Sequence, residues 1–158
     1  MQGRELAHIR VSPGRRFIGV GAFGILGVML VYLAVATPPA ILGLMFLLAT
    51  GCSALWLAVR MWQATTLSLI LTDYALYDSK GREIAPLDGV ERIERGLFAM
   101  KPSNGFTLVL DTPGPRVWEP GVWWRAGRRV AIGGVLAAHQ TRPVADILTA
   151  KVAERQAR

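Results

Sequence analysis

The side chains that most often perform chemistry are few in this sequence and lie far apart. The two histidines, His8 and His139, are separated by 131 positions, and neither has a second His or Cys at metal-ligand spacing. The single cysteine, Cys52, lies within an apolar stretch. No serine stands in a Gly-x-Ser-x-Gly nucleophile elbow, and no phosphate-binding loop is recognisable. We therefore expect no enzymatic activity, no catalytic, cofactor-binding or metal site, and no small-molecule substrate.

A segment rich in tryptophan and arginine, residues 118 to 129, is the most distinctive polar stretch of the chain. Because both residue types are enriched at lipid interfaces and in binding hot spots, the segment is a candidate contact with a membrane or a partner. In the alternative interpretation, strand alternation directs Trp118 and Trp124 into a core and leaves Trp123 and the arginines on a solvated face. The candidate contact residues are Trp123, Trp124, Arg125, Arg128 and Arg129.

A long apolar block must hold this segment close to a membrane. From Phe17 to Val59 the chain has no Asp, Glu, Lys, Arg or His, and the only break is Thr37-Pro38-Pro39-Ala40. Helices over 17–36 and 41–59 would each have the ~20 apolar residues that cross ~30 Å of hydrocarbon. The sequence therefore predicts a membrane hairpin over residues 17–60, preceded by a tail (1–16) and followed by a domain (61–158).

Small residues within the two predicted helices indicate close helix packing. The spacing of Gly19, Gly21, Gly24 and Gly27 resembles a dinucleotide fingerprint, but that fingerprint requires a preceding strand, which is missing here. In lipid, small residues instead let another helix approach closely. That helix is either the second helix of the hairpin or a helix of another protein. The candidate packing or partner residues are Gly21, Gly24, Gly27, Gly51, Ala54 and Ala58.

The distribution of charge predicts the topology. The chain carries a net charge of +7, and Arg15, Arg16 and Arg60 flank the apolar block, whereas its central loop is uncharged. Basic residues beside a span hold that end in the cytoplasm, so we expect both termini there. Together with Trp56 and Trp62, these arginines are predicted to contact anionic lipid. A nucleic-acid partner is not expected, because no basic stripe with a nucleic-acid motif is present.

The sequence after the hairpin predicts a sheet followed by a helix. Leu67, Leu69 and Leu71 alternate with polar residues, and Phe106, Leu108 and Leu110 alternate after an Asn-Gly turn signal. Residues 88–100 fit either a helix with a capping box or a strand, and we favour the strand. Further strands are predicted over 116–124 and 129–132, and a helix from about residue 141 to the end.

These elements resemble bacterial pleckstrin-homology-like domains, which commonly follow a pair of transmembrane helices. The residues that carry the resemblance are the strand at 67–72, the turn Ser79-Lys80-Gly81, the segment 82–93 and the terminal helix. The plan is also similar to that of small two-helix inner-membrane proteins of proteobacteria. The resemblance implies an α+β fold: a strongly bent antiparallel sheet or barrel of about seven strands with a C-terminal capping helix, joined to a membrane α-helical hairpin.

These observations lead to two functional hypotheses. The first is a non-catalytic accessory subunit or assembly factor of a larger complex in the bacterial inner membrane, which binds its partner subunits through the hairpin and the domain. The alternative is a module that binds anionic membrane lipid at the membrane surface and has no stable protein partner.

Overall fold

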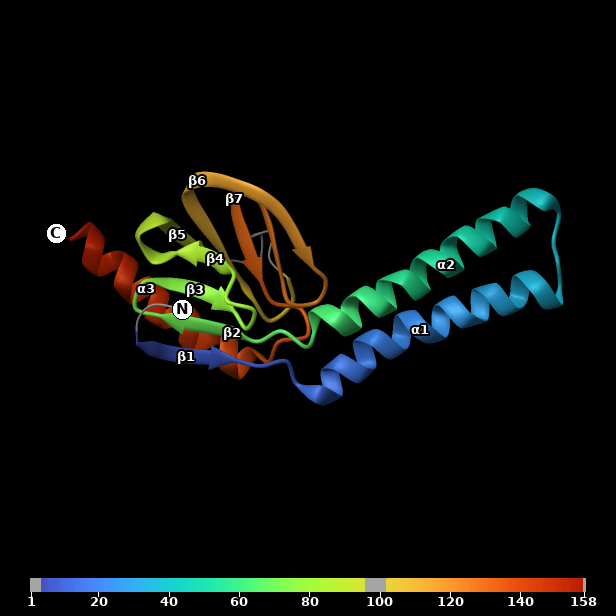
Figure 1. Ribbon diagram of the computed structural model, residues 1–158, viewed down its shortest axis with the longest axis horizontal. Coiled ribbons are helices and arrows are strands. Elements are labelled where there is room, and N and C mark those ends of the chain that lie inside the picture. Colours follow the sequence, from blue (N-terminus) through green and yellow to red (C-terminus); the bar gives the residue numbers. More distant parts are fainter. Residues whose placement is uncertain (1–3, 96–101, 158) are drawn as a thin grey trace.

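Two long helices project from one end of a sheet domain as an antiparallel hairpin (Figure 1). The computed structural model describes residues 4–95 and 102–157. Helix α1 covers Pro13–Ala36 and helix α2 covers Ile41–Ala64, and each is long and apolar enough to cross a membrane. Large apolar side chains such as Ile18, Val35 and Leu42 are exposed along the helices. This outward apolar surface is typical of a membrane contact.

Both helices extend further toward the domain than predicted. Helix α1 begins at Pro13 rather than Phe17, and α2 ends at Ala64 rather than Val59. The flanking residues Arg15, Arg16 and Arg60 are therefore helical. The change from apolar to basic side chains marks the end of the apolar block, but the backbone hydrogen bonds of the helix continue beyond it.

The first sheet contains an unexpected strand. Its order is β1-β2-β3-β4, all antiparallel, with bounds Glu5–Ile9, Leu69–Thr72, Ala75–Asp78 and Glu83–Pro86. Strand β1 pairs with β2, and Ile9 is buried in the core. The description of residues 1–16 as a tail is thus corrected for residues 5–9, which belong to the sheet domain. The two strands flank the hairpin in sequence, so the domain holds both ends of the hairpin on the same side.

The second sheet is made of β5 (Val90–Glu94), β6 (Phe106–Glu119) and β7 (Trp123–Ile132), in that order and antiparallel. Strand β5 follows a short 3-10 turn, η1, at Leu87–Gly89. The strand interpretation of residues 88–100 is therefore confirmed for β5, while the part from residue 96 onward lies outside the described residues. Strand β6 is one long, bent strand (Figure 1), whereas the sequence predicted separate strands around residues 106–110 and over 116–124.

The C-terminal helix α3, Ala138–Gln156, packs on β5 and β1. Its buried residues Val144 and Leu148 join a core that also contains Leu69, Leu108 and Phe106. The helix begins three residues before Thr141, so Pro143 lies inside its first turns rather than at its start. Proline has no N–H, so at this position it cannot donate to the carbonyl oxygen four residues earlier.

The predicted fold class is thus confirmed at a coarse level. The chain has two long apolar helices, two antiparallel sheets and a C-terminal helix, which is an α+β arrangement. The seven strands of the described residues do not form one closed barrel, because they hydrogen-bond as separate sheets of four and three strands.

Candidate membrane and partner interface

Glycine lets the two helices of the hairpin come into backbone contact. A Cβ atom placed on Gly27 would lie 2.9 Å from the carbonyl oxygen of Gly51, and one placed on Gly51 would lie 3.2 Å from that of Gly27. Ala54 and Ala58 are buried in the same helix α2. Four of the six candidate packing residues, Gly27, Gly51, Ala54 and Ala58, are therefore buried, and the glycine pair among them packs within the hairpin.

Gly21 and Gly24 do not share this contact. No atom lies within 4 Å of a Cβ placed on either residue, and both are half-exposed. By contrast, Gly19 faces the domain junction, where a Cβ would meet Met61 of α2 and Val135. The glycine run of α1 therefore divides between two faces: one packs on α2 and the domain, and the other is open.

Aromatic and basic side chains gather where the hairpin meets the domain. The guanidinium of Arg16 lies 3.8 Å from the ring centroid of Trp62, and the ring of Phe17 lies 5.7 Å from that of Trp62. The guanidinium of Arg60 lies 6.0 Å from the ring of Trp56. Such cation–π pairs hold the arginines beside aromatic rings, and both residue types are enriched at membrane interfaces. Arg15 instead donates a hydrogen bond to the carbonyl oxygen of Leu136, 3.3 Å away, and so links α1 to the domain.

The arrangement of the tryptophans differs from both sequence interpretations. Trp118 pairs with Trp124 across β6 and β7, and Glu119 pairs with Trp123. Directly opposed residues share one face of a sheet. The face with Trp123 is the inner one, since this side chain is 2% exposed, whereas Trp118 is 47% exposed. Trp123 is therefore a core residue rather than a surface contact, and Trp118 lies at the surface rather than in the core.

Two of the candidate arginines bind groups within the domain. Arg128 donates hydrogen bonds to the carbonyl oxygen of Leu110 (2.8 Å) and to the carboxylate of Glu91 (2.6 Å). Arg125 donates to the carbonyl oxygen of Ile84 (3.3 Å), and its guanidinium occupies the space beside Gly114, where a Cβ would overlap it. These two side chains connect strands, while Arg129 is half-buried on β7.

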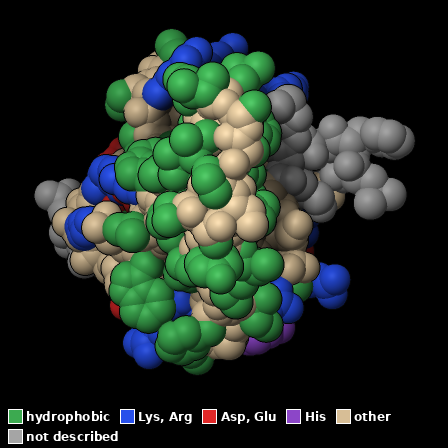
Figure 2. All heavy atoms as spheres, turned by 90° about the vertical axis from the view of Figure 1, so that its right-hand side faces the viewer, with side chains coloured by type: hydrophobic (Ala, Val, Ile, Leu, Met, Phe, Trp, Pro, Cys, Tyr) green, Lys and Arg blue, Asp and Glu red, His purple; other side chains and the backbone are tan. Residues whose placement is uncertain are grey.

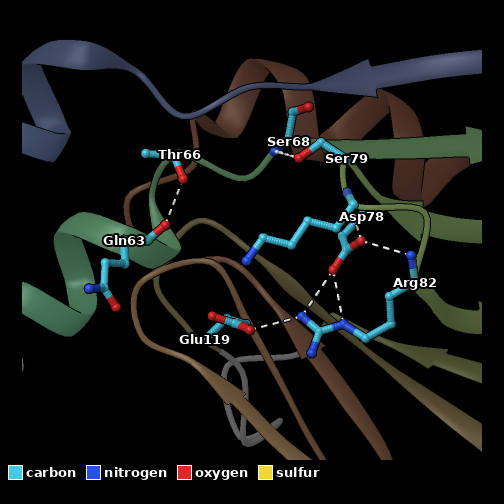
Figure 3. Close-up of polar contacts among 8 residues, drawn as sticks. Gln63, Thr66, Ser68, Asp78, Ser79, Arg82 and Glu119 are labelled. Carbon is cyan, nitrogen blue, oxygen red and sulfur yellow. Dashed lines mark hydrogen bonds and ion pairs between the residues drawn. The ribbon is translucent and has the colours of Figure 1, made fainter.

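A charged cluster that the sequence analysis missed lies within the sheet domain, between the β3–β4 turn and the end of β6 (Figure 3). Asp78 is fully buried and accepts hydrogen bonds from the backbone N–H groups of Lys80 and Arg82, at 3.0 and 2.9 Å. The Arg82 guanidinium donates to Asp78 (2.9 Å) and to Glu119 (2.8 Å), and it lies 4.9 Å from the ring of Trp123. An Asp followed by Ser-Lys-Gly is a turn signal that could have revealed the backbone part of this cluster.

The cluster also explains the ionisation of Arg82. Burial lowers the pKa of Arg82, but hydrogen bonds to Glu119 and Asp78 and the negative charges of both carboxylates outweigh burial, so the pKa is raised above its ordinary value. Arg82 therefore stays charged at any pH at which the protein is handled. The permanent positive charge of Arg82 therefore joins the β3–β4 turn to the end of β6.

Two further polar contacts lie near this cluster, where the chain leaves helix α2 and enters the sheet domain. The Thr66 hydroxyl donates to the carbonyl oxygen of Gln63, and the backbone N–H of Ser68 donates to the hydroxyl of Ser79, as Figure 3 shows. Within the described ranges, no three His, Cys, Asp or Glu side chains are grouped so as to hold a metal ion. The geometry is that of a structural junction between the apolar hairpin and the sheet domain.

Comparison of the chain with protein-family models, with curated proteins and with solved structures finds no match. The likeness to pleckstrin-homology-like domains consequently stays a prediction.

Proposed function

We propose that this chain is a non-catalytic protein of the bacterial inner membrane that serves as an accessory subunit or assembly factor of a larger membrane complex. The observation that carries the proposal is the open glycine face of α1. Gly21 and Gly24 have no neighbour within 4 Å of a Cβ position, although other small residues of the hairpin are used for packing. A helix of a partner subunit would find there the close backbone approach that small residues permit.

The same proposal orients the protein with the domain and both termini in the cytoplasm. Arg15, Arg16 and Arg60 all lie at the domain end of the hairpin, and the far loop, residues 37–40, carries no charge. Positive charge beside short spans favours the cytoplasmic side. In this orientation the domain lies against the cytoplasmic leaflet, where it would contact both lipid and the partner subunits.

Co-purification in a mild detergent tests the proposal. The full-length protein is isolated from the cells that naturally produce it, and accompanying subunits are identified by mass spectrometry. We expect stoichiometric membrane subunits with the native chain and their loss with Gly21→Leu plus Gly24→Leu. Ala49→Leu is a matched control, since Ala49 is an exposed residue of α2. Recovery of the native chain alone, together with unchanged levels of membrane complexes after its gene is deleted, would contradict the proposal.

A second candidate function is binding of anionic lipid at the membrane surface without a stable protein partner. A view along the hairpin toward the domain favours it, because Lys and Arg side chains lie around the apolar helices and little Asp or Glu surface is visible (Figure 2). Basic side chains near a membrane are attracted by anionic headgroups. The test uses the full chain, since a fragment of residues 61–158 would lack β1. Retention of anionic lipid by a monomer in native mass spectrometry would support this function, and equal retention of neutral lipid would contradict it.

A further inference from the structure

The turn between β6 and β7 lies beside helix α2 of the hairpin. We call residues 116–126 the β6–β7 tip. The ring centroid of Trp118 in this tip lies 6.2 Å from that of Trp56 in α2. A Cβ placed on Gly121 would lie 3.0 Å from Met61, and the carbonyl oxygen of Gly121 accepts a hydrogen bond from Val135 (2.9 Å). The tip therefore contacts α2 at Trp56 and Met61, and it is hydrogen-bonded to Val135 within the domain.

The depth of Trp56 indicates where the tip lies relative to a bilayer. Measured along α2 from Ile41, ~30 Å of hydrocarbon ends about 20 residues later, close to Arg60. Trp56 precedes Arg60 by one helical turn, or about 6 Å along the axis. Its ring neighbour Trp118 is consequently at the boundary between hydrocarbon and headgroups, even though it belongs to the sheet domain.

The outer face of the tip has the chemistry of this boundary. Trp118 and Trp124 are cross-strand partners on that face, and they line a shallow groove together with Arg116, Val117, Arg125 and Ala126. Arg116 is exposed. Indole rings with a neighbouring cation are favoured at the headgroup layer, where one part of the side chain meets hydrocarbon and the other meets water or phosphate.

The inner face of the same tip explains why it keeps its position. Glu119 and Trp123 point to the opposite side from Trp118, and both contact Arg82, which is bound in turn to the buried Asp78. This charged cluster fixes the tip to the β3–β4 turn. The outward tryptophans are thus presented by a rigid element rather than by a free loop.

We propose that the β6–β7 tip is a membrane-interface element that inserts Trp118 and Trp124 into the headgroup layer beside α2, with Arg116 close to lipid phosphate. The occupant of the groove between the two tryptophans is phospholipid. Two observations favour lipid over a partner protein: the surface of the tip is continuous with the membrane-spanning helix through Trp56, and the exposed Arg116 in the groove is a cation that matches phosphate. The proposal requires the hairpin to span a membrane but does not depend on a partner complex.

Quenching of tryptophan fluorescence by brominated lipid tests the insertion. The full-length protein is placed in bilayers that contain no other protein, with ordinary or brominated acyl chains, and the native chain is compared with Trp118→Phe and Trp123→Phe. We expect Trp118→Phe to remove a quenched component, so the quenched fraction of the remaining fluorescence falls. Trp123→Phe is the matched control, because it removes a buried tryptophan, and the quenched fraction should rise.

A different pattern of quenching would overturn the proposal. If Trp118→Phe raises the quenched fraction as Trp123→Phe does, and water-soluble iodide quenches Trp118 instead, the tip faces water and the proposal is overturned. Trp124→Phe provides an independent variant in case Trp118→Phe fails to fold, with the same expected direction. Circular dichroism of every variant checks that the fold is retained.

Discussion

The backbones of Gly27 and Gly51 lie against each other, so that neither residue has room for a side chain. This contact joins α1 to α2 near the middle of the hairpin. Gly24, only one helical turn away from Gly27, has open space instead. The same substitution is therefore expected to have opposite outcomes for the stability of the hairpin at Gly27 and at Gly24.

We expect Gly27→Leu to destabilise the hairpin by about 1–3 kcal/mol, because an inserted side chain forces packed helices apart. Gly24→Leu should leave the stability of the isolated protein nearly unchanged. Unfolding of both variants in detergent, followed by circular dichroism, measures the difference. Equal destabilisation by both substitutions would show that the two glycines share one packed face.

A second prediction concerns β1. Ile9 is 1% exposed and lies in the core of the sheet domain. Ile9→Ala should reduce the free energy of unfolding by roughly 2–4 kcal/mol, since it leaves a cavity. If residues 1–16 were a separate tail, the substitution would have no effect. Thermal unfolding compared with Ala7→Gly, at a half-exposed position of the same strand, separates the two outcomes.

The charged cluster gives a third prediction. Asp78→Ala removes the acceptor for the backbone N–H groups of Lys80 and Arg82 and the partner of the Arg82 guanidinium. Unsatisfied groups at a buried site cost about 1–3 kcal/mol each, so the β3–β4 turn should become markedly less stable. Hydrogen exchange of the Lys80 and Arg82 amides measures the effect locally. The exposed Glu83→Ala is the control, and equal exchange in both variants would contradict the role of Asp78.

Ionisation of Arg82 should not make stability depend on pH in the ordinary range. The pKa of Arg82 in the folded protein is raised above its usual value by Glu119 and Asp78, in spite of burial. A raised pKa contributes stability that is fully present below the unfolded-state pKa, and this contribution is lost only as the pH rises through the folded-state pKa, in strong alkali. Arg82→Met should therefore lower the melting temperature by the same amount at pH 6 as at pH 9.

Arg128 is expected to matter more for stability than Arg129. Arg128 joins β7 to β6 through the Leu110 carbonyl oxygen and to β5 through Glu91. Because the Arg128–Glu91 ion pair is about half exposed, Arg128→Ala should cost about 1 kcal/mol, and Arg129→Ala less. Chemical denaturation of both variants gives the comparison. A larger loss of unfolding free energy with Arg129→Ala would contradict this prediction. It would indicate that the contacts of Arg129 contribute more stability than the hydrogen bonds by which Arg128 connects the strands.

The pair of long apolar helices was predictable because it depends on composition: no charge interrupts residues 17–59, and only Thr37-Pro38-Pro39-Ala40 breaks them. Strand β1 was not predictable in this way. It is five residues long, and its pairing partner β2 lies some sixty residues later, beyond the entire hairpin. No local periodicity of Glu5–Ile9 carries information about so distant a neighbour.

The orientation of the tryptophans was missed for a different reason. Phe106, Leu108 and Leu110 face inward, and simple alternation would carry this face on to Trp118. The register between β6 and β7 shifts between Val109 and Gly114 and again before Val117. Alternation cannot be counted through such an irregular stretch, because bulged residues interrupt the two-residue period of a strand. Alternation in the sequence places Trp118 and Trp124 on the same face of the sheet. The irregular pairing of β6 with β7 decides whether that face is the inner or the outer one.

Pairing of β1 with β2 also has a consequence for the order of events during synthesis. The ribosome releases β1 first, then two spans, and only afterwards the strand that completes its hydrogen bonds. In the proposed membrane topology, the sheet domain can close only after both helices have crossed the bilayer and the chain has returned to its starting side. A nascent protein whose second span failed to insert would leave β1 and β2 on opposite sides of the membrane, so closure of the domain reports that insertion was completed.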